Sequence, residues 1–75
     1  MNLIEALQEK QRVSGVSEEA FAWQLGISPR MWDYLRSGGR RLGGKSLSLV
    51  LQHYPDLRKL VWDYIESLAR IQEAK

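Results

Sequence analysis

The chain has 75 residues and no cysteine, so it has room for one small domain, without a disulfide framework or a thiolate metal site. Its formal net charge is only +2, but the window 30–45 holds five basic residues and one acidic residue, whereas the rest of the chain is net acidic. No apolar run approaches membrane-spanning length and the N-terminus lacks the pattern of a secretory signal, so we expect a soluble, cytoplasmic protein with no membrane association.

The first two predicted helices span residues 2–12 and 18–25. Gly15 is placed as a left-handed cap after the first helix, and Ser17 as the N-cap of the second. Trp23 falls on the less buried side of the second helix, where it either packs under the first helix, as we expect, or contacts a partner. The inward-facing residues are Leu3, Ile4, Leu7 and Val13 in the first helix, and Phe21, Ala22 and Leu25 in the second.

A third helix is predicted over 29–37, after a turn formed only by Gly26 and Ile27. Its ends are marked by capping residues and by a proline at the first position: Ser28, Pro29, Gly38 and Gly39. Two helices joined by so short a turn cross steeply. The inward side chains are Met31, Trp32 and Leu35, and we expect Trp32 to pack in the core rather than stack on a ligand.

A basic, glycine-rich loop over 38–45 precedes two more predicted helices. Ser46 is expected to cap a short helix that ends before Pro55 and carries Leu47, Leu49, Val50 and Leu51. The last helix, over 56–73, has a heptad-like seam made of Leu57, Val61, Tyr64, Leu68 and Ile71. We therefore expect an all-α fold, a compact bundle of five short helices that forms a single domain over 1–75.

Residues 18–37 resemble the helix-turn-helix of the phage-repressor (Cro and Xre-like) family of DNA-binding proteins. The resemblance rests on small and apolar residues at fixed offsets: Ala22, Gly26, Ile27, Trp32 and Leu35. It implies a lambda-repressor-like fold in which residues 29–37 form the recognition helix and enter the major groove of double-stranded DNA. The helices that the family places before and after this unit correspond to those predicted here up to about residue 54.

The resemblance places the base-contacting residues on the outward face of the recognition helix, at Pro29, Arg30, Asp33 and Tyr34. Arg30 is expected to make a bidentate contact with guanine. Phosphate contacts are expected near the start of the second helix and in and around the loop after the third, from Ser17, Gln24, Ser28, Arg36, Ser37, Arg40, Arg41 and Lys45. Glu18 stands where the family often has glutamine, and a carboxylate cannot donate a hydrogen bond to phosphate, so Ser17 or Gln24 is expected to replace this contact.

Two other classes of function fit parts of the sequence. The string from Gly39 to Ser46 matches the phosphate-loop pattern G-x-x-x-x-G-K-S, but that pattern needs a preceding buried strand, and the preceding segment has helical spacing. His53 is the only imidazole and has no recognisable nucleophile around it, so we expect no enzyme activity, no metal and no cofactor. The alternative is a protein-interaction module that binds a polymerase, a toxin or another regulator through the helix over 56–73.

The expected function is that of a transcriptional regulator, a repressor of phage or bacterial origin. The positive charge gathered beside the recognition helix favours DNA over a protein partner. A domain of this size makes few base contacts, so we expect a homodimer that reads half-sites about 34 Å apart, with the heptad-like seam as its interface. The same seam residues alternatively close the small core of one chain.

Overall fold

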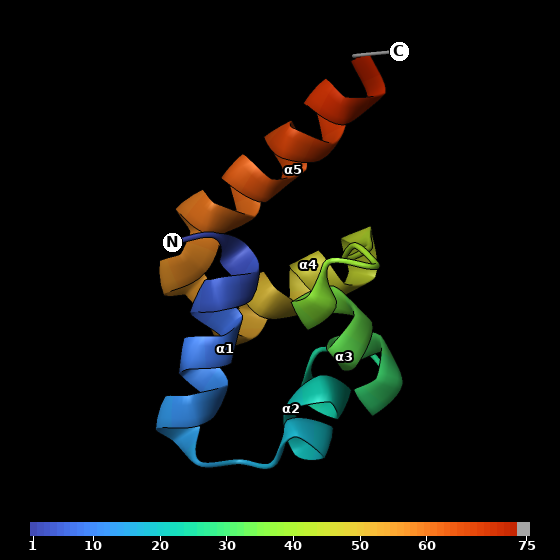
Figure 1. Cartoon of the computed structure of the whole chain (residues 1–75). Helices are drawn as coiled ribbons and strands as arrows, with labels where there is room; N and C mark the ends of the chain where they lie inside the picture. The colour runs from blue at the N-terminus through green and yellow to red at the C-terminus, as the bar shows by residue number, and fades with distance from the viewer. Residues whose placement is uncertain (74–75) are drawn as a thin grey trace.

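Five α-helices and one 3-10 turn account for most of residues 1–73, which the computed structural model describes with side chains through residue 69 (Figure 1). The helices are α1 (Leu3–Ser14), α2 (Glu18–Gln24), α3 (Pro29–Ser37), α4 (Gly44–His53) and α5 (Arg58–Glu73), with the 3-10 turn η1 at Pro55–Leu57. The described residues contain no strand, and the predicted compact all-α class is confirmed. Within the same residues, none of the helices combines the length and apolar character needed to cross a membrane.

Side-chain caps explain where the first three helices begin. Asn2 and Glu5 cap α1 reciprocally: the Asn2 side-chain oxygen accepts from the Glu5 N–H at 2.8 Å, and the Glu5 carboxylate accepts from the Asn2 N–H at 3.0 Å. Ser17 and Ser28 each accept the N–H three residues further on at 3.1 Å, which confirms both as N-caps. These bonds satisfy donors that the first turn of a helix leaves unpaired.

The chain leaves α2 through a hydrogen-bonded glycine turn. Gly26 has a φ of +75°, its N–H donates to the Trp23 carbonyl at 3.0 Å, and the Ile27 N–H donates to the Ala22 carbonyl at 3.1 Å. Because α3 starts only three residues after Gly26, the two helices lie directly against each other. Glycines of positive φ also follow α1 and α3, at the predicted positions Gly15 and Gly38.

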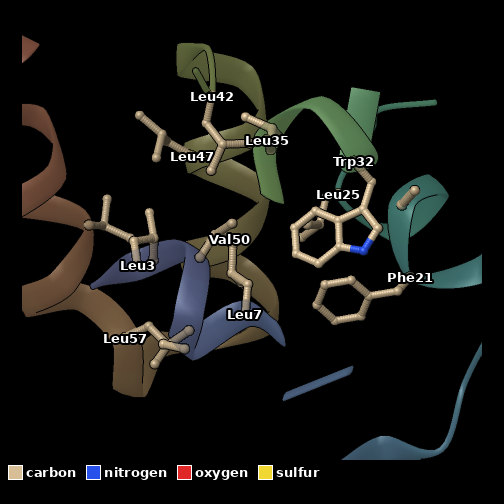
Figure 2. Packing of buried hydrophobic residues seen from close by; sticks show 13 residues of the cluster. Leu3, Leu7, Phe21, Leu25, Trp32, Leu35, Leu42, Leu47, Val50 and Leu57 are labelled. Carbon is tan, nitrogen blue, oxygen red and sulfur yellow. The ribbon is translucent and has the colours of Figure 1, made fainter. Parts of the chain in front are cut away.

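The core lies between α1, the α2–α3 pair, α4 and the first turns of α5 (Figure 2). Trp32 is fully buried, as predicted, and its ring centroid lies 5.3 Å from that of Phe21. The buried hydrophobic residues are Leu3, Ala6, Leu7, Phe21, Ala22, Leu25, Trp32, Leu35, Leu42, Leu47, Val50, Leu57 and Val61. Partly buried residues, including Ile4 in α1 and Met31 in α3, pack around this cluster.

Two side chains predicted to pack inward are exposed. Val13 is 70% exposed, because it lies near the end of α1, beyond the first two turns that contain all the buried residues of this helix. Trp23 is 60% exposed, because it is one position beyond the inward-facing Ala22. The prediction that Trp23 packs under α1 is therefore wrong.

The helix α4 starts two residues earlier than the predicted cap. Gly43 is its N-cap, without a side-chain hydrogen bond, and Ser46 is buried within the first turn. The cause is Leu42, which is 3% exposed and brings the preceding loop into the core. The Leu42 N–H also donates to the Tyr64 hydroxyl oxygen at 3.0 Å, so α5 holds the end of this loop.

The start of α5 closes the core of the single chain. Leu57 belongs to η1, and both Leu57 and Val61 are buried among residues of the same chain, so they are not available for the dimer interface predicted from the seam. Tyr64 and Leu68 are partly buried, and the side chain of Ile71 lies outside the described residues. The C-terminal half of α5 extends beyond the other helices (Figure 1).

Candidate nucleic-acid interface

The outward face of α3 carries a row of exposed polar side chains. Arg30, Tyr34 and Ser37 follow one another at helical spacing, with Asp33 beside them, and all four are exposed, whereas Pro29 is half-buried at the start of the helix. The buried side chains on the opposite face of α3 hold this helix against the core. The structure therefore brings the predicted base-contacting residues together on one exposed side of a helix held firmly against the core.

Three cations continue this surface from the end of α3 to the start of α4. The Arg40 guanidinium carbon lies 6.0 Å from the centroid of the Tyr34 ring, so the loop after α3 contacts the polar row. Arg41 and Lys45 follow in the same loop and in the first turn of α4. These three and Arg30 are exposed, and none forms an ion pair with a described residue, so four positive charges remain for an anionic partner.

Arg36 is held by the protein's own carboxylates. Its Nη1 donates to Glu18 Oε1 at 2.7 Å, its Nη2 donates to Glu18 Oε2 at 3.2 Å, and Nη2 also bonds to the Asp33 carboxylate. The hydrogen bonds that Arg36 donates to Glu18 are the main cause of a raised pKa of its guanidinium. Partial burial lowers this pKa, and the hydrogen bond donated to Asp33 raises it further. The phosphate contact predicted for Arg36 does not fit these interactions, because its charge is already compensated.

Several side chains predicted to contact phosphates already form a hydrogen bond within the protein. The Ser17 and Ser28 oxygens accept from the first turns of α2 and α3, and the Ser37 hydroxyl donates to the Tyr34 carbonyl at 3.0 Å. Gln24 Oε1 accepts from a tyrosine hydroxyl, whereas no described residue accepts from the Gln24 amide group. These side chains lie at the starts and ends of α2 and α3, and the hydroxyl hydrogens of Ser17 and Ser28 and the Gln24 amide group remain uncommitted donors within the described part of the chain.

Tyr54 supports the α2 end of this surface and was not predicted as a core or site residue. Its ring lies 6.1 Å from that of Phe21 at an angle of 28°, and its hydroxyl donates to Gln24 at 3.2 Å. Burial raises the pKa of Tyr54, and the nearby ammonium group of Lys10 acts in the opposite direction. The sequence showed only an aromatic residue before Pro55, and nothing in it connected that residue with α2.

No family model matches the chain, and neither a curated protein nor a solved structure matches it. Among the side chains that the structure describes, no group of three or more His, Cys, Asp or Glu residues is placed to hold a metal ion. The string from Gly39 to Ser46 runs from the end of α3 into α4, so a helix precedes it where a phosphate loop needs a strand.

Proposed function

We propose that this protein binds double-stranded DNA sequence-specifically through α3 and regulates transcription as a repressor of phage or bacterial origin. The observation that supports this function is the exposed polar row of α3, which is continuous with uncompensated cations in the loop that follows. An α-helix fits the major groove, where base edges offer hydrogen-bonding groups, and the flanking cations suit the phosphates. In the proposed role the protein acts in the bacterial cytoplasm and needs no cofactor.

Each part of this surface has a distinct proposed role. Arg30, in the first turn of α3, donates two hydrogen bonds to O6 and N7 of a guanine, and Tyr34 contacts a thymine methyl group or a phosphate. The more distant cations Arg40, Arg41 and Lys45 neutralise phosphates, and each such contact contributes about 0.9 to the slope of log affinity against log salt concentration. Base preference therefore depends on α3, and salt dependence on the loop.

The test is selection of bound sequences from a random duplex library, with the wild type, Arg30→Ala and the control Arg58→Ala. We expect the wild type to enrich a defined sequence with at least one strongly preferred guanine. Arg30→Ala loses that preference, a change worth about 1–3 kcal/mol, whereas Arg58→Ala, which removes an exposed arginine from α5, retains it. If the wild type retains no duplex even at low salt, the proposed function is wrong.

We propose further that two copies bind together, because the few base contacts of one small domain suit a dimer that reads half-sites about 34 Å apart. Since Leu57 and Val61 are buried within one chain, we place the interface on the exposed flank of α5. Trp62, at 57% exposure, and Ile65, at 36%, lie on this flank. The C-terminal half of α5, which follows these residues, extends beyond the other helices and is open to a second copy (Figure 1).

The alternative is a protein-interaction module in which the same flank of α5 binds a polymerase, a toxin or another regulator. The exposed indole of Trp62 favours this function, because tryptophan is enriched among the residues that dominate binding at protein interfaces. The duplex selection separates the two functions, because a module that binds only proteins enriches no DNA sequence.

A further inference from the structure

Arg36 holds two carboxylates from two different helices at once. Glu18, the first residue of α2, has both carboxylate oxygens bound to the guanidinium, at 2.7 and 3.2 Å. Asp33, one turn before Arg36 on α3, uses only Oδ1 in this interaction, and no described residue donates to its Oδ2. One oxygen of Asp33 is therefore fixed, and the other remains available on the exposed side of α3.

The position of Arg36 is itself fixed by packing. Its side chain is only 29% exposed, and its guanidinium carbon lies 5.7 Å from the centroid of the buried Trp32 ring. The bidentate contact with Glu18 restricts the guanidinium plane further, since two parallel hydrogen bonds define an orientation. A side chain held in this way cannot reach out to a phosphate without giving up both carboxylates.

We infer that Arg36 is a positioning residue of the DNA-reading surface, which directs the free oxygen of Asp33 to the exocyclic amino group of a cytosine. This inference rests on the proposed DNA binding. A carboxylate only accepts hydrogen bonds, and in the major groove cytosine presents its N4 amino group as a donor. Guanine and thymine present acceptors there, and adenine presents its donor beside the acceptor N7, which repels a carboxylate.

The two carboxylates have different roles in this arrangement. Glu18 stands at the N-terminus of α2, where the helix dipole favours a negative charge, and anchors Arg36 from outside α3. Asp33 reads the base, and the bond between its Oδ1 and Arg36 fixes the orientation of its carboxylate. Glu18 thus affects base preference through Arg36 and contacts no nucleotide.

The test is the same library selection, with salt titrations on the selected duplex, for the wild type, Asp33→Asn, Arg36→Met and the control Arg41→Met. We expect one position at which the wild type prefers cytosine by about five- to tenfold or more. Asp33→Asn and Arg36→Met both lose preference at that same position, and Arg36→Met leaves the salt slope unchanged. Arg41→Met keeps every base preference and lowers the salt slope by about 0.9.

A second variant avoids any dependence on the folding of Arg36→Met. Glu18→Gln removes the charge of the anchor and one of its two acceptor oxygens without altering the residues of α3. We expect it to weaken the cytosine preference at the position affected by Asp33→Asn, with an unchanged salt slope. Circular dichroism and thermal unfolding verify that each variant is folded.

Two results would overturn the inference. If Arg36→Met keeps all base preferences and lowers the salt slope as Arg41→Met does, Arg36 is a phosphate contact, and the proposed DNA binding stands without this inference. The same holds if Glu18→Gln frees Arg36 and steepens the salt slope. If the wild type retains no duplex at any salt concentration, the proposed function and the inference fail together.

Discussion

Trp32 fills the contact between α2 and α3 and is the largest fully buried side chain of the described core. Its indole N–H has no hydrogen-bond partner among the described residues, although the nitrogen is buried. A buried donor without a partner costs about 1–3 kcal/mol, so the contribution of Trp32 comes from the packing of its ring. The tilted contact with Phe21 at 5.3 Å is part of that packing (Figure 2).

Replacing Trp32 with alanine and with phenylalanine separates the ring from the N–H group. Trp32→Ala leaves a cavity and is expected to cost about 3–5 kcal/mol, a large share of the roughly 4–11 kcal/mol expected for 75 residues. Trp32→Phe keeps an aromatic ring against Phe21 and removes the unpaired donor, so we expect a cost of about 1 kcal/mol. Urea unfolding followed by far-ultraviolet circular dichroism measures both. Equal losses in the two variants would contradict a role based on ring packing.

Individual residues were predictable where local spacing decides their surroundings. Phe21, Trp32 and Leu35 follow the inward period of their helices and are buried as predicted. The bond between Arg36 and Glu18 was not predictable from the sequence. Glu18 lies 18 residues earlier and comes close to Arg36 only because α2 and α3 cross. Leu42 was missed for a related reason: it is an isolated apolar residue between arginines and glycines, and its burial depends on α5.

The turn between α2 and α3 determines how the candidate recognition helix is held. Gly26 has a φ of +75°, and a Cβ atom added there would lie 2.8 Å from Cδ1 of Leu49 in α4. Gly15, after α1, has almost the same φ of +74°, but a Cβ atom there would meet no atom within 4 Å. The two positions therefore share the backbone conformation and differ in the space around it.

Alanine at these two glycines tests that difference. Gly15→Ala is expected to cost about 1–2 kcal/mol, because L-residues disfavour the left-handed region. Gly26→Ala carries the same conformational cost as Gly15→Ala and must also displace the Leu49 side chain. We therefore expect its free energy of unfolding to be lower than that of Gly15→Ala by up to about 1 kcal/mol. Urea midpoints of the two variants give the comparison directly. A smaller loss for Gly26→Ala than for Gly15→Ala would show that the Leu49 contact does not limit the turn.

The first residues of helices are easier to predict from the sequence where side-chain caps determine them than where tertiary contacts do. The starts of α2 and α3 follow from Ser17 and Ser28, which bond within their own first turns. The start of α4 depends on the burial of Leu42, and the start of α5 follows the 3-10 turn that begins at Pro55. Local sequence predicts caps well because donor and acceptor lie three residues apart, whereas these two starts depend on packing against distant residues.

The whole molecule presents two different surfaces on separate elements. Arg30, Arg40, Arg41 and Lys45 lie on or next to α3 and give this surface four positive charges without an ion pair to a described residue. The exposed aromatic side chain of α5 belongs to the helix that extends away from the body of the molecule (Figure 1). In the proposed dimer, this separation would leave the α3 surface of each copy free for the proposed DNA binding.

The oligomeric state tests this arrangement, and the chain offers a matched pair of exposed tryptophans. Trp62 on α5 is 57% exposed and Trp23 on α2 is 60% exposed, so each presents a similar apolar area to solvent on a different helix. In sedimentation at increasing concentration, we expect the wild type and Trp23→Gln to approach the mass of a dimer together, whereas Trp62→Gln remains a monomer. Burial of an indole at the centre of an interface is worth about 2 kcal/mol or more, which is at least a 30-fold change in the dissociation constant.

A wild-type protein that stays strictly monomeric at high micromolar concentration would exclude the dimer, and loss of association in Trp23→Gln alone would move the interface to α2. Because α2 packs directly against the candidate recognition helix, an interface there would crowd the surface proposed to enter the groove.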